Sequence, residues 1–296
     1  MLRELLPADD EKLVEDWHTA LCVIGAVNVV ALFVLLAKVD AKDGYGRWMK
    51  LLCVPWVVEC AWRSVFVSLY LQRYVWYDSP LNAILVDRCL ACVGELCWTV
   101  QISMALWRHS DGSRFVKGAC VFAPLCYVFA EAASFYNVAT TNERWAAMEV
   151  ALDAIAVVPM APAACYALSR GVARDSRASK LFLVVLALSV VGLGYFNFFK
   201  DVPMYLARYE ADEKAGKTYF DFVPGLRDAA ETRVVTRTYA SWHEDMFWMT
   251  AYFTLACWSG LFLMFAPRPA HDPVFGKRRY VVLDARVEPL LPPESA

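Results

Sequence analysis

The sequence predicts an all-α fold, a polytopic bundle of seven transmembrane helices. Hydrophobic residues make up 59% of the 296 residues and charged residues only 20%, whereas soluble domains have roughly 45–50% apolar and about 25% charged residues. Seven stretches are also apolar enough to cross a bilayer, which takes roughly 20 residues because the hydrocarbon layer is about 30 Å thick. These stretches are residues 17–37, 48–70, 81–107, 115–136, 145–168, 181–199 and 242–266.

The charge balance excludes nucleic acid as a main partner. The chain has 29 Lys and Arg residues against 31 Asp and Glu residues, which leaves no basic excess for a phosphate backbone. The lipid bilayer is the expected surrounding, and the sequence leaves open which membrane it is and whether the protein joins an oligomer or a larger complex. Asp9, Asp10 and Glu11 stand where a cleaved signal peptide has its positive charges, so the first apolar stretch is predicted to be retained.

Three regions are expected along the chain. Residues 1–16 form a short outer segment, residues 17–266 the transmembrane domain with an outer loop at about 206–241, and residues 267–296 a tail. Orientation follows from the short loops, because Lys and Arg concentrate on the cytoplasmic side of membranes. One side of the predicted bundle carries most of them, including Lys38, Arg108 and Arg170. The N-terminus is therefore predicted to be outside or luminal, and the C-terminal tail cytoplasmic.

Ionisable residues inside the apolar stretches mark the candidate site. An ionised side chain at the centre of a membrane helix costs about 2.5–3.5 kcal/mol, so such residues are a functional-site hypothesis. With the predicted orientation they fall in the outer half of the bundle, and Glu59 and Glu95 come nearest to the midplane. We therefore predict a polar cavity that opens toward the outside. Its candidate residues are Glu59, Arg63, Asp87, Arg88, Glu95, Glu131, Asn142, Glu149, Asp153, His243 and Glu244.

Helical spacing predicts which of these side chains share a face. Glu59 and Arg63 are four residues apart, which suits an ion pair within one helix. Glu149 and Asp153 have the same spacing and either share a proton or hold a cation. The neighbours Asp87 and Arg88 point about 100° apart on a helix of about 3.6 residues per turn, so they are expected to face different partners.

The sequence lacks the characteristic residues of three known seven-helix families. A retinal protein needs a lysine in its last helix, and residues 242–266 have none, which argues against retinal as a cofactor. G-protein-coupled receptors carry an acidic-Arg-aromatic motif at the cytoplasmic end of the third helix, whereas Asp87-Arg88-Cys89 is predicted at the opposite end. Ceramidase-type hydrolases need about three histidines near one face, but only His18 and His243 are expected near the outer face.

A closer resemblance covers the second to seventh predicted helices. There the chain resembles a family of multi-spanning membrane proteins for which no activity is established. The resemblance implies fold and membership alone. The strings that carry the resemblance are Asp78-Ser79-Pro80-Leu81, Asp87-Arg88, Val93-Gly94-Glu95-Leu96-Cys97, Ala130-Glu131, Thr140-Thr141-Asn142 with Glu149, and Trp242-His243-Glu244-Asp245.

Three functions fit these observations, and the sequence identifies no catalytic residue. The first is a transporter or channel for protons, cations or a small polar solute. The second is an intramembrane enzyme acting on a lipid-like substrate, with or without a metal ion. The third is a structural or accessory subunit whose charges lock helices together. A metal ion, if one is used, would be held by Glu95, Glu131, Glu149, His243 and Glu244.

Overall fold

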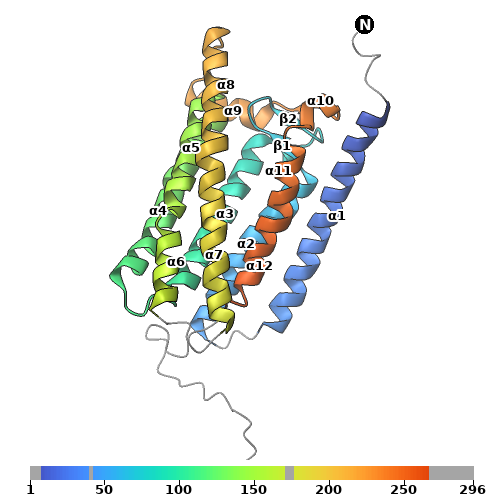
Figure 1. Cartoon of the computed structure of the whole chain (residues 1–296). Helices are drawn as coiled ribbons and strands as arrows, with labels where there is room; N and C mark the ends of the chain where they lie inside the picture. Colours follow the sequence, from blue (N-terminus) through green and yellow to red (C-terminus); the bar gives the residue numbers. More distant parts are fainter. Residues whose placement is uncertain (1–7, 40–42, 171–176, 267–296) are drawn as a thin grey trace, which may run out of the picture.

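The computed structural model describes residues 8–39, 43–170 and 177–266. The predicted tail, 267–296, and the first seven residues of the predicted outer segment lie outside the described residues. Figure 1 shows long helices standing side by side, with short helices and strands gathered at one end of the bundle. We call this end the capped end. The all-α prediction is confirmed.

The chain passes back and forth along the bundle before it returns to the capped end. The first elements are α1 (Ala8–Lys38), α2 (Gly44–Val65), β1 (Ser68–Leu69), β2 (Tyr74–Val75), η1 (Pro80–Asn82), α3 (Ile84–Trp107), α4 (Arg114–Thr140), α5 (Glu143–Val157) and α6 (Met160–Ser169). The remaining elements are α7 (Arg177–Phe196), η2 (Asn197–Asp201), α8 (Val202–Lys214), α9 (Phe222–Glu231), β3 (Val234–Val235), α10 (Tyr239–Trp242), α11 (Met246–Ala251), η3 (Tyr252–Ala256) and α12 (Cys257–Leu263).

Six helical stretches of the described chain are long and apolar enough to cross a membrane, which makes this an integral membrane protein. α2 is not among the six, because its 22 residues include Arg47, Lys50, Glu59 and Arg63. The six stretches are Asp10–Lys38, Ile84–Trp107, Arg114–Thr140, Glu143–Ser169, Arg177–Lys214 and Met246–Leu263.

Several helix ends differ from the sequence prediction. α1 begins at Ala8, within the predicted outer segment, and α2 ends at Val65 because the chain turns into the β1–β2 hairpin. The helix predicted to end at residue 199 continues to Lys214, so the loop predicted at about 206–241 begins later than residue 206. This helix passes through η2, a π-helical turn. Pro203 follows it and has no N–H for the carbonyl four residues earlier, which a π turn accommodates.

The loop after α8 forms part of the capped end. β1 and β2 pair antiparallel, and β3 joins β2 as a parallel strand. α9 packs closely on α4, since a Cβ atom on Gly225 would lie only 1.8 Å from the carbonyl oxygen of Ala139. Arg73 Nε donates to Asp228 at 2.8 Å and ties the hairpin to α9. The loop is therefore fixed to the ends of the helices.

Two apolar cores flank the centre of the bundle. One joins α4, α6 and α7 and includes Cys120, Ala164 and Leu183. The other joins α1, α2 and α12 and includes Leu21 and Leu261. The charged side chains of α2, α3, α4 and α5 belong to neither core.

Candidate functional site

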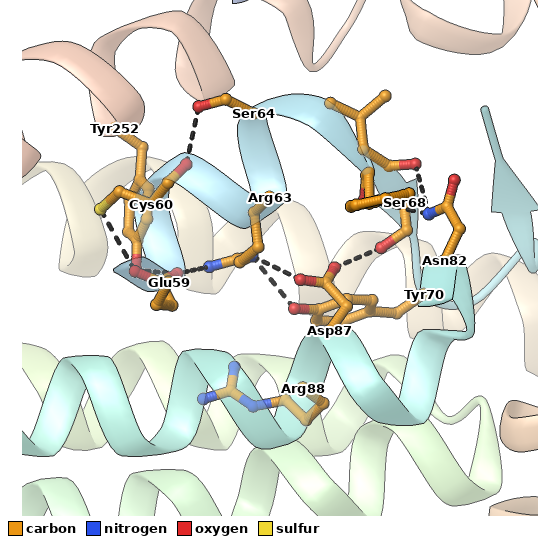
Figure 2. A network of polar contacts seen from close by, with 12 residues as sticks. Glu59, Cys60, Arg63, Ser64, Ser68, Tyr70, Asn82, Asp87, Arg88 and Tyr252 are labelled. Carbon is orange, nitrogen blue, oxygen red and sulfur yellow. Dashed lines mark hydrogen bonds and ion pairs between the residues drawn. The ribbon is translucent and has the colours of Figure 1, made fainter. Parts of the chain in front are cut away.

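Arg63 on α2 gathers the first group of acidic side chains. Its Nη1 donates to Oε1 of Glu59 at 2.6 Å, one helical turn earlier, as the spacing predicted. Its Nε lies 2.7 Å from Oδ1 of Asp87 on α3. Its Nη2 donates to the hydroxyl of Tyr70 at 3.1 Å, and Ser68 donates to the other oxygen of Asp87. Figure 2 shows Arg63 held between Glu59 and Asp87.

Arg88 on α3 gathers a second group. Its Nη2 donates to Oε2 of Glu95 at 3.1 Å and also to Oε2 of Glu131 on α4. Its Nη1 donates to Oε1 of Glu149 on α5 at 3.4 Å. One guanidinium group thus connects carboxylates from three helices.

Glu95 connects the two groups. Its Oε2 faces Arg88, while its Oε1 lies 3.9 Å from Nη1 of Arg63. The hydroxyl of Tyr252 donates to the same Oε1 at 2.7 Å and lies 3.3 Å from Oε1 of Glu59. Tyr252 is the first residue of η3, a π-helical segment, and such segments are frequent at functional sites. We call these eight residues the carboxylate network: Glu59, Arg63, Asp87, Arg88, Glu95, Glu131, Glu149 and Tyr252.

The local sequence explains this arrangement. Arg88 and Glu95 are seven residues apart, about two turns, so they share a face of α3. Asp87 is rotated by about 100° from Arg88 and reaches α2 instead, which confirms that the two neighbours face different partners. Gly94 allows α3 to approach α2 closely, because a Cβ there would lie 2.9 Å from the Cβ of Glu59.

Burial and charge distinguish the members of the network. The side chains of Glu59, Asp87 and Arg88 are almost fully buried, whereas those of Glu95 and Glu149 keep 19% and 20% of their exposure. Among the described residues, two guanidinium groups pair with five carboxylates. With every carboxylate ionised, the network would carry three uncompensated negative charges.

Asp153 lies one turn beyond Glu149 on α5 and is only partly buried. Within the described residues, neither a hydrogen bond nor an ion pair holds its carboxylate. The predicted pair of Glu149 and Asp153 therefore consists of one carboxylate bound to Arg88 and one unpaired carboxylate. Asp153 extends the acidic face of α5 by one turn.

Three predicted site residues lie elsewhere. Asn142 caps α5 by accepting the backbone N–H of Arg144 at 2.9 Å. His243 is exposed and bonds the backbone carbonyl of Tyr239. Glu244 is exposed too and pairs with Arg208 at 2.9 Å. The structure does not bring these residues into the carboxylate network.

The five residues considered for a metal ion do not form one ligand set. Glu95, Glu131 and Glu149 converge, but the guanidinium of Arg88 occupies the space between them. His243 and Glu244 lie at the surface. Across the described parts of the chain, no group of three or more His, Cys, Asp or Glu side chains is arranged to hold a metal ion.

Sequence reasoning missed the polar partners of the network that are not charged. Tyr252 and Tyr70 are not among the predicted site residues, although a buried tyrosine hydroxyl usually needs a partner. Ser68 lies just past the end of α2, in the β1–β2 hairpin that was not predicted. The thiol of Cys60 donates to Oε2 of Glu59 at 3.2 Å. The sequence feature that could have indicated this role of Cys60 is its position next to Glu59.

The fold and site together define a class: an integral membrane helical protein with a charged network inside its bundle. Comparison of the chain with models of known families, with curated proteins and with solved structures finds no match. The resemblance to a family of multi-spanning membrane proteins therefore stays a prediction.

Proposed function

We propose that this protein is a transporter or channel that moves protons or small cations through the carboxylate network. The observation that carries the proposal is the excess of carboxylates over guanidinium groups. Charge in a membrane interior is costly, so the excess has to be compensated by protons or by a bound cation. Groups that take up and release such ions within a bundle are what a transport path requires.

The exposed fractions suggest where ions enter. Glu95 and Glu149 are the network carboxylates with the most exposed side chains, and Asp153 extends the acidic face beside them. Glu59 and Asp87 are enclosed by Arg63 and their hydrogen bonds. We propose that ions reach Glu149 or Glu95 first, from a polar cavity, and that Glu59 is an inner station reached through Tyr252.

We further propose that α2 is a seventh membrane-spanning helix. Its 22 residues extend for about 33 Å, enough for a hydrocarbon layer of about 30 Å. α1 and α3 both begin at the capped end in Figure 1, so the chain has to return along α2 between them. The charges that reduce the hydropathy of α2 include Glu59 and Arg63, which pair inside the bundle.

With seven spans the termini lie on opposite sides of the membrane. The excess of Lys and Arg in the loops away from the capped end supports an outer or luminal N-terminus and a cytoplasmic tail. The capped end then faces outward. In sealed vesicles of known orientation, an added protease should cut the 215–221 segment only where the outer face is exposed, and cleavage only of inverted vesicles would reverse this orientation.

The function is tested with purified protein in liposomes. Fluxes of H⁺, Na⁺ and K⁺ are measured for the wild type and for Glu95→Gln, Glu131→Gln and Glu149→Gln. Glu210→Gln is the matched control, because Glu210 is an exposed carboxylate of α8 outside the network. We expect a flux of at least one of these ions that the network variants reduce and the control retains.

Two results would contradict the proposal. Bound metal at stoichiometric amounts, lost in the network variants without any ion flux, would favour an intramembrane enzyme. Variants that lower only the melting temperature, in a protein without measurable flux, would favour a structural or accessory subunit.

A further inference from the structure

A groove lies on the surface of the bundle between α4 and α5, near the ends of the helices opposite the capped end. Its volume is about 540 Å³, and its lining is almost entirely apolar. The side chains of Phe115, Phe122, Ile155 and Val158 are between 40% and 56% exposed there, as expected for a surface that faces lipid. The carboxylate network contacts α4 at Glu131, more than two helical turns beyond Phe122.

Two sequence features open this groove. α5 ends at Val157 and α6 begins at Met160, so the helix is broken where Pro159 lines the groove. On α4 the wall facing this break has a glycine at its centre. A Cβ atom on Gly118 would meet no atom within 4 Å, so position 118 faces open space that only a bulkier side chain would fill.

Basic residues occur near the end of the groove. Arg114 lines it at the first turn of α4. The ammonium group of Lys117, one turn further on, lies 5.5 Å from the ring centroid of Trp107. The ring of Phe115 lies 6.3 Å from that of Tyr166, and Arg170 comes one turn after Tyr166 at the end of α6. Within the described chain, none of these three basic side chains forms an ion pair.

We propose that the groove is a binding site for one anionic phospholipid. An acyl chain would lie along Phe115, Gly118 and Phe122, and the phosphate would pair with Arg114 and Arg170. An apolar groove with Arg114 at its end is complementary to such a molecule, because the acyl chain is apolar and the phosphate is negative. Basic sites between membrane helices bind acidic headgroups. The proposal does not depend on ion transport.

The site is tested on the full-length protein in detergent by native mass spectrometry. Added phosphatidylglycerol is compared with phosphatidylcholine and with inorganic phosphate alone. Gly118→Phe fills the groove, and Gly192→Phe is the matched control, since Gly192 is also an exposed helical glycine with nothing within 4 Å of an added Cβ. Arg114→Gln removes one cation at the groove.

We expect the wild type and Gly192→Phe to retain phosphatidylglycerol, and Gly118→Phe to lose it while its melting temperature is unchanged. Arg114→Gln should reduce the preference over phosphatidylcholine about fivefold, the factor for one basic residue at an anionic surface. Equal retention by Gly118→Phe and Gly192→Phe would overturn the proposal. So would equal binding of the two lipids by the wild type, or binding of phosphate alone with the same affinity.

Discussion

The hydroxyl of Tyr252 lies 2.7 Å from Oε1 of Glu95, the carboxylate that faces both arginines of the network. The same hydroxyl lies 3.3 Å from Glu59. A phenol has one proton to donate and also accepts, so Tyr252 connects the two carboxylates without charge of its own. These contacts join the last membrane helix to α2 and α3.

Removal of the Tyr252 hydroxyl should strongly reduce ion flux and only moderately reduce the stability of the fold. We expect Tyr252→Phe to lower ion flux in liposomes severalfold, because the link between Glu95 and Glu59 is lost. The free energy of unfolding should fall by about 1.5–3 kcal/mol, the contribution of one hydrogen bond to a charged group. Tyr195→Phe, at an exposed tyrosine of α7, should change neither quantity. Full flux through Tyr252→Phe would remove Tyr252 from the path.

Arg88 should be the most costly residue of the network to remove. Arg88→Met leaves Glu131 and Glu149 without their cation and Glu95 with Arg63 alone. Loss of one partner of a buried ion pair costs about 3–5 kcal/mol. Denaturant unfolding in detergent measures this loss. The comparison is Arg208→Met, which breaks an exposed pair with Glu244 and should cost no more than about 1 kcal/mol. Similar stability of the two variants would contradict the described burial of Arg88.

A methyl group at position 94 should disturb the contact between α2 and α3. In Gly94→Ala the new Cβ would lie 2.9 Å from the Cβ of Glu59, so Glu59 or the helix has to move. We expect a loss of about 1–3 kcal/mol in the free energy of unfolding, typical of overpacking. Gly192→Ala has open space and should be neutral or slightly stabilising, because alanine favours helix over glycine. A neutral Gly94→Ala would show that the helices are not in close contact there.

His109 should make stability depend on pH. It follows α3 and is fully buried; Nδ1 lies 2.9 Å from the carbonyl oxygen of Ala105, and the ring packs on Phe182. Burial, and to a smaller degree Arg108, lowers the pKa of His109 below its usual value of 6.5. The unfolded chain therefore binds a proton at a higher pH than the folded protein does. Stability is full above pH 6.5 and declines as the pH falls toward the lowered pKa.

The check on His109 is a series of melting temperatures between pH 8 and pH 5. His109→Gln should have a smaller decrease than the wild type over this range. His243→Gln should follow the wild type, because His243 is exposed. The same decrease in His109→Gln as in the wild type would show that other groups cause it.

The part of the site that depends on one helix could be predicted from the sequence. The pair of Glu59 and Arg63 and the different directions of Asp87 and Arg88 follow from helical geometry alone. The convergence of Glu131 and Glu149 on Arg88 depends on how α4 and α5 pack against α3. Their predicted depth in the membrane indicated that these groups share one polar region. No spacing in the sequence specifies which cation they share.

The difference between the predicted and observed positions of His243 and Glu244 has a local cause. The prediction places both residues in the first turn of a continuous last helix, with their side chains inside the bundle. In the structure α10 ends at Trp242 and α11 begins at Met246, so residues 243–245 form the turn between them at the capped end. Trp242 is the residue of this segment that is buried.

The central claim is that ions move through the carboxylate network, and Glu95 is its common member. The most direct measurement is proton uptake into liposomes driven by an inside-negative potential, with wild type and Glu95→Gln at equal protein content and equal external Na⁺ and K⁺. We expect uptake above that of empty liposomes for the wild type, or a matching Na⁺ or K⁺ flux, and a loss of most of it in Glu95→Gln. Equal uptake by the two proteins, or no flux of any of these ions through the wild type, would contradict it.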